Sequence, residues 1–320
     1  MIKKMMITGV LLSVVFGLMG CFKTVEKEPI ADRQVNAVAT IGMISDIVGI
    51  IGKGRVKVEA LMGPGVDPHL YRATENDVMR LRDADIVFYN GLHLESKMGE
   101  ILEKLSGEKQ TVPVAEGIQK SKLLSPKEYE GLYDPHVWFD VQLWMEAAKA
   151  VEAALVALDP THRSVYETQA RTYLAELKRL DEDVRALANS IPKSKRVLVT
   201  AHDAFNYFAT AYGFEVRGLQ GLSTQAEAGI EDVRQLAAFI SQRQIPAIFV
   251  ESSVPKRNIE AVQKAVQAKG WETRIGGELF SDAMGDAGTE EGTYIGMVRH
   301  NIHTIVAALT KNNYKKEQVK

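Results

Sequence analysis

The sequence predicts an α/β protein of two lobes, each with a parallel sheet flanked by helices, and one long rigid helix links the lobes. Two observations predict this fold. Strand and helix patterns alternate on both sides of the middle of the chain, which is typical of parallel sheets. Between them, a helical pattern begins at Pro160 and meets no further glycine or proline before Pro192. At 1.5 Å per residue, roughly 30 residues make a rod of about 45 Å, which is longer than one small lobe.

The long helix carries one continuous apolar stripe. Its apolar residues are spaced alternately by four and three positions, so they share one face. They are Tyr166, Ala170, Tyr173, Leu177, Leu180, Val184, Leu187 and Ile191. Asp159 is placed to cap this helix, and Pro160 suits its first position, where a missing N–H costs nothing. The alternative to a spine between two lobes is a long surface helix on a single domain.

Length and composition are those of an ordinary globular protein. A chain of 320 residues is long enough for two domains, and its hydrophobic fraction of 46% and charged fraction of 25% are average. The formal net charge is −2, and no long basic run appears before the last ten residues. We therefore expect no nucleic acid as a partner.

The N-terminus has the pattern of an export signal. Lys3 and Lys4 precede an apolar run over residues 5–20, which is short for a bilayer span of about 20 residues. Cys21 follows and is the single cysteine of the chain, so no disulfide can form within the chain. Residues 18–21 resemble a bacterial lipobox, which implies cleavage before Cys21 and a lipid anchor on its sulfur. Residues 21–34 would then be a lipidated tether, and the alternative is an uncleaved signal anchor.

An N-terminal α/β lobe is expected over residues 35–158. Its predicted strands are 35–41, 56–61, 85–89 and 111–115. Four helices are predicted in this lobe. The first follows the first strand and ends near residue 51, and the second covers residues 75–83 after a capping box of Thr74 and Asp77. The third covers residues 96–105, and the fourth begins after Asp140 as its cap and ends near residue 157. Residues 117–133 have weak periodicity and are predicted to be a loop.

The pattern restarts after the linking helix, which we assign to residues 159–191. The C-terminal lobe, residues 192–320, has predicted strands at 197–200, 215–219, 247–251 and 272–275. Its predicted helices are 204–212, 227–243, 255–269 and 292–310. In parallel sheets of this kind, ligands bind beyond the carboxyl ends of the strands.

Two histidines of the first lobe are the last residues of the same tripeptide. Asp-Pro-His occurs at His69 and again at His136, each time in a loop. Proline fixes its own φ and holds the preceding residue extended, so each histidine is presented from a stiff backbone. A single loop histidine is usually an ordinary surface residue, but the repeated presentation indicates a function.

The second lobe offers His202 directly after a predicted strand and Asp282 beyond the strand expected to end at residue 275. Either residue alone could be a helix cap or a turn residue. Taken with His69 and His136, they supply three imidazoles and one carboxylate, which is a sufficient ligand set for a divalent first-row cation. We therefore expect a metal site between the lobes.

The remaining candidates are expected to be structural. His93 lies in a turn, and His162 lies in the first turn of the long helix. His300 and His303 share a helix face without an evident acidic partner. Glu251 ends a strand and could serve as a general base near a metal. We expect it instead to bond nearby hydroxyls such as those of Ser252 or Ser253.

Several stretches together resemble the cluster A-I solute-binding proteins of metal ABC transporters, and most of all their zinc- and manganese-binding members. They are GPGVDPHLYRAT, DADIVFYNGLHLE, YDPHVWFD, TAHDAFNYFATAYGFEV, GLQGLSTQAEAG, PAIFVESSV and GGELFSDAMGDAGTEEGTYIGMVRHN, and they span most of residues 35–310. The resemblance implies two α/β lobes on one rigid helix. It also implies that His69, His136, His202 and Asp282 are the four metal ligands.

The implied function is that of an exported, lipid-anchored receptor in the periplasm or on the outer face of the cytoplasmic membrane, not an enzyme. It would bind Zn²⁺ or Mn²⁺ as a transported ligand and deliver it to a membrane permease, and we expect a monomer. Manganese-type members often have Glu where this chain has His202, whereas many zinc-type members have a His-rich loop where residues 117–133 lack histidine. The metal therefore stays open between Zn, Mn and Fe. A metal-dependent hydrolase with Glu251 as base, and a surface adhesin, are the alternatives.

Overall fold

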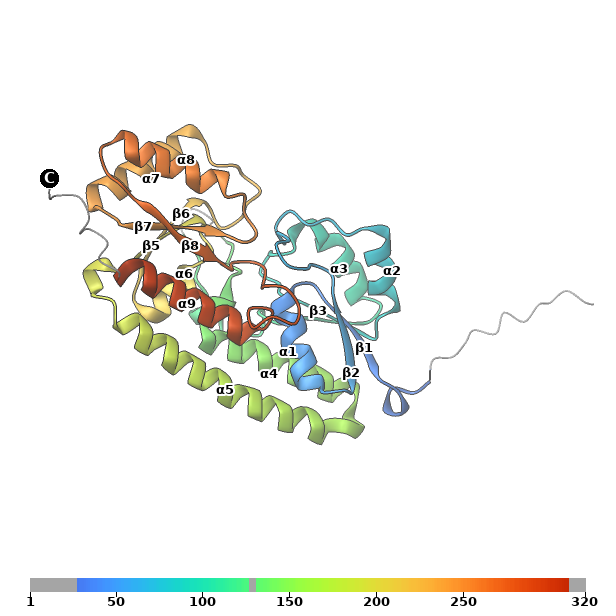
Figure 1. Cartoon of the computed structure of the whole chain (residues 1–320). Coiled ribbons are helices and arrows are strands. Elements are labelled where there is room, and N and C mark those ends of the chain that lie inside the picture. The colour runs from blue at the N-terminus through green and yellow to red at the C-terminus, as the bar shows by residue number, and fades with distance from the viewer. Residues whose placement is uncertain (1–27, 127–130, 311–320) are drawn as a thin grey trace, which may run out of the picture.

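The structure is a computed structural model that describes residues 28–126 and 131–310. Figure 1 shows two α/β lobes side by side, with the long helix α5 running beneath both. This arrangement confirms the predicted fold class. The predicted signal segment and Cys21 lie outside the described residues. Within the described residues, none of the helices combines the length and apolar character needed to cross a bilayer.

The first lobe contains a four-stranded parallel sheet in the order β2-β1-β3-β4. Its strands are β1 (Val35–Ala39), β2 (Val56–Ala60), β3 (Ile86–Tyr89) and β4 (Gln110–Pro113). Its helices are α1 (Gly42–Gly52), α2 (Glu75–Asp83), α3 (Gly99–Ser106) and α4 (Val141–Leu158). All four predicted strands are present, and the helix expected from residue 96 begins as a short 3₁₀ turn (Ser96–Met98) before α3.

Both predicted N-terminal caps of the first lobe are present. The Thr74 hydroxyl accepts from the backbone N–H of Asp77 at 3.2 Å, and the Asp77 carboxylate accepts from the backbone N–H of Thr74 at 2.8 Å. This is a reciprocal capping box. Asp140 accepts from the backbone N–H of Gln142 at 2.9 Å and so begins α4.

In the described part of the second lobe the strands pair in parallel and form two separate ladders. β5 (Val197–His202) pairs with β6 (Glu215–Gln220), and β7 (Ala247–Glu251) pairs with β8 (Arg274–Leu279). β5 and β7 lie side by side, yet no ladder of backbone bonds joins them in the described chain. The parallel sheet predicted for this lobe is therefore divided into two ladders.

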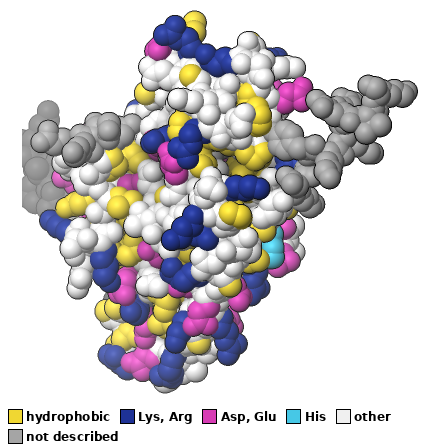
Figure 2. All heavy atoms as spheres, turned by 90° about the vertical axis from the view of Figure 1, so that its left-hand side faces the viewer, with side chains coloured by type: hydrophobic (Ala, Val, Ile, Leu, Met, Phe, Trp, Pro, Cys, Tyr) yellow, Lys and Arg dark blue, Asp and Glu magenta, His cyan; other side chains and the backbone are white. Residues whose placement is uncertain are grey.

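The helices of the second lobe are α6 (Asn206–Tyr212), α7 (Ile230–Arg243), α8 (Arg257–Ala268) and α9 (Tyr294–Thr310). The helix expected from residue 227 begins only at Ile230. The reason is a local cap, because the Asp232 carboxylate accepts from the backbone N–H of Gly229 at 2.7 Å. Figure 2 views the molecule from the left-hand side of Figure 1 and shows acidic and basic side chains interspersed on that face.

The linking helix α5 (Arg163–Asn189) follows a short 3₁₀ turn (Pro160–His162). Its stripe is fully buried except at Leu187, which is half-buried, and it packs on α1 and α4 of the first lobe and on α6 and α9 of the second. The prediction that Asp159 caps the helix is wrong. Its carboxylate instead accepts from the Tyr166 hydroxyl at 2.8 Å and from Arg55 at 3.1 Å, so it ties the helix to the first lobe.

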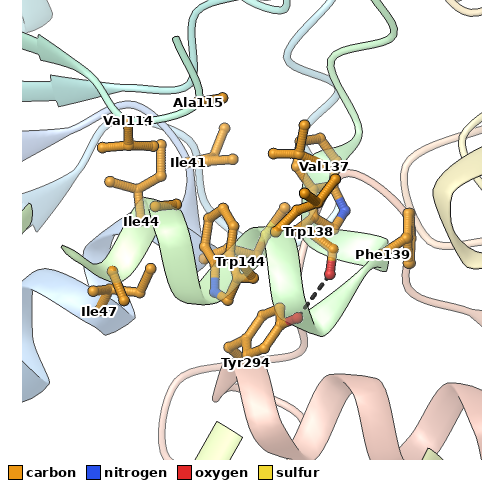
Figure 3. Packing of buried hydrophobic residues seen from close by; sticks show 14 of the residues in the cluster. Ile41, Ile44, Ile47, Val114, Ala115, Val137, Trp138, Phe139, Trp144 and Tyr294 are labelled. Atoms are coloured by element: carbon orange, nitrogen blue, oxygen red, sulfur yellow. Dashed lines mark hydrogen bonds between the residues drawn. The ribbon is translucent and has the colours of Figure 1, made fainter. Parts of the chain in front are cut away.

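One hydrophobic core runs through both lobes and the linking helix. Figure 3 shows its centre, where the Trp144 ring on α4 stacks on the Tyr294 ring at the start of α9, with centroids 5.2 Å apart. Because the two lobes share this core, they are packed together as well as linked. The second lobe has a further small cluster beneath α7 and α8.

Candidate metal centre

The structure brings the four predicted site residues together in the interior between the lobes. One ligand atom from each of His69, His136, His202 and Asp282 lies within 4.8 Å of the others, and each residue is at most 2% exposed. Nε2 of His69 lies 3.2 Å from Nε2 of His136 and 3.5 Å from Oδ2 of Asp282. Asp282 also places Oδ1 3.5 Å from Nε2 of His136, and Oδ2 3.2 Å from Nε2 of His202.

The four separations of 3.2–3.5 Å suit a small four-coordinate cation. A tetrahedral ion with bonds of about 2.0–2.1 Å requires its ligand atoms to lie about 3.3 Å apart. Nε2 of His202 and both carboxylate oxygens of Asp282 are buried, and apart from the contacts among the four site residues they have no hydrogen-bond partner in the described part of the chain. Buried polar atoms without partners are costly, and a cation at the centre would satisfy all three.

The two Asp-Pro-His segments fold in the same way. Asp67 accepts from the backbone N–H of His69 at 2.9 Å, and Asp134 accepts from the backbone N–H of His136 at 3.0 Å. Each aspartate therefore fixes the backbone of the histidine two residues later. Oδ1 of Asp134 also lies 2.7 Å from Nδ1 of its histidine, His136. The second oxygen of Asp67 instead accepts from the Thr224 hydroxyl of the other lobe at 2.5 Å.

His202 is the last residue of β5, and Glu251 is the last residue of the neighbouring strand β7. Oε2 of Glu251 lies 2.6 Å from Nδ1 of His202, and Oε1 accepts from the backbone N–H groups of Ala201 and His202 at 2.6 and 2.9 Å. A carboxylate on Nδ1 turns Nε2 toward the centre. The expectation that Glu251 bonds the hydroxyls of Ser252 or Ser253 is therefore wrong.

The charges in the site are set by burial and by these partners. Burial is the main cause that lowers the pKa of His69 to about 3, so this imidazole is neutral. Burial opposes a charge on His202, but the nearby carboxylates of Glu251 and Asp282 raise its pKa well above its usual range. Burial also opposes a charge on Asp282, but the neighbouring imidazoles, His202 above all, lower its pKa below its usual range. A cation binds the neutral imidazole, so it competes with a proton for His202.

The other histidines do not join the centre. His93 is exposed in a loop with a positive φ of 67°, and His162 contacts Asp159 at 3.0 Å. His300 contacts the carbonyl oxygen of Glu278 at 3.1 Å and lies 3.7 Å from the Glu291 carboxylate. The expectation that His300 has no acidic partner is wrong, although its structural role agrees with the prediction.

Sequence reasoning did not identify the residues that orient the ligands. Asp134 could have been found from its place in the repeated tripeptide. Glu251 could not, because its contact with His202 joins residues 49 positions apart. Asp282 was expected beyond a strand ending at residue 275, but β8 continues to Leu279 and ends three residues before it.

An α/β fold of two lobes on a long helix, with imidazoles and a carboxylate gathered between the lobes, defines the class of metal-binding solute-binding proteins. Residues 37–308 match the ZnuA family, described as zinc-uptake complex component A, periplasmic. The chain belongs to this family.

Relatives in this family have metals in their names. The chain is 56% identical over 285 residues to the zinc-binding protein TroA of Treponema pallidum, covering 89% of this chain and 92% of that protein. It is 48% identical over 294 residues to the manganese-binding lipoprotein MntA of Bacillus subtilis, covering 92% and 95%. The solved structure of the periplasmic zinc-binding protein TroA superposes with a TM-score of 0.85 and covers 87% of this chain and 100% of that chain.

Proposed function

We propose that this protein captures a divalent transition metal, Zn²⁺ or Mn²⁺, between its two lobes and delivers it to the membrane permease of an ABC transporter for import. The observation that carries the proposal is the convergence of four buried ligand atoms on one point. His69 and His136 would bind from the first lobe, and His202 and Asp282 from the second. Membership of the family and the similarity to metal-binding relatives support the same conclusion.

The donor set bears on which ion is bound. Three imidazole nitrogens and one carboxylate suit Zn²⁺, which accepts nitrogen well and has no geometric preference from its d electrons. Mn²⁺ prefers oxygen ligands and more of them. A site of this kind should bind Zn²⁺ more tightly in absolute terms, following the Irving–Williams order. The relatives include one protein named for zinc and one named for manganese. Which ion occupies such a site in a cell depends on the supply of each metal as well as on the ligands.

The geometry does not favour a metal-dependent hydrolase. Such an enzyme needs an open metal position for water and a base beside it. Here four protein atoms already surround the centre, and Glu251 contacts His202 through Nδ1, on the side of the ring away from the centre. No feature of the described residues supports the adhesin alternative.

We further propose that residues 1–20 are removed on export and that Cys21 is lipidated, which would tether residues 35–320 to the outer face of the cytoplasmic membrane through residues 21–34. The lipoprotein name of MntA supports this. We also propose that residues 35–158 form the N-terminal lobe, residues 159–191 the linking helix and residues 192–320 the C-terminal lobe, and that the protein is a monomer.

The anchor is tested with Cys21→Ser, which should release the protein from membranes in cell fractionation or block its processing. Full membrane retention of a processed Cys21→Ser protein would place the anchor elsewhere.

The proposed transport function is tested by elemental analysis of the protein as purified, combined with uptake of Zn²⁺ and Mn²⁺ by cells with and without it. We expect one transition-metal ion per chain and slower uptake of that ion in cells that lack the protein. A chain purified without transition metal that also leaves the uptake of both ions unchanged would overturn the proposal.

A further inference from the structure

We propose that Trp138 is a positioning residue that locks His136 of the first lobe to Asp282 of the second, and that this lock sets the preference of the site for Zn²⁺ over Mn²⁺. The inference rests on the proposed metal-binding function and extends it. Trp138 lies two residues after His136, in the short 3₁₀ turn Val137–Phe139, and is completely buried. It touches no metal ligand atom by a hydrogen bond, so any effect on the metal must act through its neighbours.

The indole ring of Trp138 packs against the His136 imidazole. The ring centroids are 5.2 Å apart, and the planes are tilted by 69° in an edge-on contact. Nδ1 of His136 is already held by Asp134 at 2.7 Å. The imidazole is therefore fixed by a hydrogen bond at one nitrogen and by an aromatic wall, which together leave it little freedom to rotate.

The same indole donates a hydrogen bond across the interface. Nε1 of Trp138 donates to the backbone carbonyl of Ser281 at 3.0 Å, and this carbonyl belongs to the peptide bond that leads into Asp282. The Ser281 hydroxyl lies 2.9 Å from that of Ser253, which is buried two residues after Glu251. Ser281, directly before Asp282, is thus held from the first lobe at its carbonyl and from the turn after β7 at its side chain.

A second bond from the other lobe holds the backbone of Trp138. The Tyr294 hydroxyl at the start of α9 donates to the Trp138 carbonyl at 2.7 Å, as Figure 3 shows. The backbone N–H of Tyr294 in turn donates to the Asp46 carboxylate of the first lobe at 3.0 Å. Trp138 is therefore fixed to the second lobe through both its side chain and its main chain.

The consequence is a fixed span between two candidate ligands from different lobes. Nε2 of His136 and Oδ1 of Asp282 lie 3.5 Å apart, close to the spacing of about 3.3 Å that a tetrahedral Zn²⁺ requires. If the span relaxes, Zn²⁺ loses its fitted four-ligand shell. Mn²⁺ loses less, because it accepts water oxygens and higher coordination.

The test is Trp138→Phe, which keeps an aromatic ring beside His136 and removes the N–H donor. Zn²⁺ and Mn²⁺ dissociation constants are measured by chelator competition on the full-length folded protein. We expect the Zn²⁺ constant to rise about tenfold and the Mn²⁺ constant by less than about threefold, so the ratio narrows. Constants within about twofold of wild type, or equal losses for both ions, would overturn the inference, because a purely structural role predicts equal losses.

Trp271→Phe is the matched control. The indole N–H of Trp271 also donates to a backbone carbonyl, that of Ile245 at 3.0 Å, but the ring packs against the separate cluster beneath α7 and α8. The variant should leave the Zn/Mn affinity ratio unchanged, and a ratio changed as much as in Trp138→Phe would make the effect a general one of losing an indole. Should Trp138→Phe fail to fold, Tyr294→Phe removes the bond to the Trp138 carbonyl and should narrow the ratio in the same direction, whereas an unchanged ratio would count against the lock.

Metal binding by the wild type separates a failure of the proposed function from a failure of the role proposed for Trp138. A wild-type protein that binds neither ion removes the proposed function and the inference with it. A wild-type protein that binds one ion, together with a Trp138→Phe variant of unchanged affinities, removes only the role of Trp138.

Discussion

The Glu251 carboxylate lies 2.6 Å from Nδ1 of His202, and both side chains are buried at the ends of adjacent strands. The second oxygen of the same carboxylate accepts the last two backbone N–H groups of β5. One side chain therefore fixes both the His202 imidazole and the backbone of the strand that carries it. Among the described residues, β5 and β7 end side by side without a backbone ladder between them, and from this place the second lobe contributes His202 to the candidate metal centre.

Glu251→Gln should weaken Zn²⁺ binding by about 10–100-fold, as loss of a carboxylate behind a metal-binding histidine usually does. The amide can still accept from the backbone of β5, but it offers His202 no negative charge. The measurement is chelator competition at neutral pH. Glu278→Gln is the control, since Glu278 pairs only at the surface with Lys256 through its side chain. Equal affinities for wild type and Glu251→Gln would show that the contact does not support binding.

Leu177→Ala should destabilise the protein by about 2–5 kcal/mol, as loss of a buried leucine does. Leu177 is fully buried in the middle of the α5 stripe, where the helix packs on both lobes. Lys178→Ala, at the next and exposed position, should change stability by no more than about 0.5 kcal/mol. Urea unfolding measures both. A Leu177→Ala variant as stable as its neighbour would contradict the role of α5 as a buried spine.

Asp46→Asn should stabilise the metal-free protein at neutral pH. Burial raises the pKa of Asp46 from 3.8 to about 6, although its carboxylate accepts from the backbone N–H of Tyr294. The folded protein therefore binds this proton more tightly than the unfolded chain. The cost of ionising Asp46 is absent below about pH 4, grows between about pH 4 and 6, and is complete above that, where it reaches about 2–3 kcal/mol.

Asparagine keeps an acceptor for Tyr294 and carries no charge, so the stability difference between Asp46→Asn and wild type should be near zero at about pH 4 and grow as the pH rises. Urea unfolding of both metal-free proteins over this range measures the difference. A difference that stays constant with pH, or a less stable variant at neutral pH, would contradict the assignment.

Local signals in the sequence predicted the elements that local chemistry determines. The stripe that includes Tyr173 and Leu177 predicted the spine, and Thr74 with Asp77 predicted a helix start. The proline in the repeated Asp-Pro-His predicted two stiffly presented histidines, and in the structure each aspartate adds a bond to the backbone only two residues along the chain.

Contacts between distant segments could not be predicted in the same way. The last strand was expected to end at residue 275, but β8 continues through Gly276 and Gly277 to Leu279. In the structure a Cβ on Gly276 would lie 2.7 Å from Cβ of Ala308 and 2.9 Å from the Phe249 ring, so glycine is required there by the close approach of α9. The Glu251–His202 and Trp138–Ser281 contacts likewise depend on how strands and lobes meet.

The central claim, that four side chains from two lobes bind one ion, is tested most directly by competitive Zn²⁺ and Mn²⁺ titration of the metal-free wild type, His202→Ala and His202→Glu. The wild type should bind one ion per chain. His202→Ala should weaken both ions, because it removes one of four ligands. His202→Glu should narrow the Zn/Mn affinity ratio by about tenfold, or about 1.4 kcal/mol, because a carboxylate replaces a nitrogen. If neither substitution changes either affinity, His202 is not a ligand and the two-lobe metal centre is contradicted.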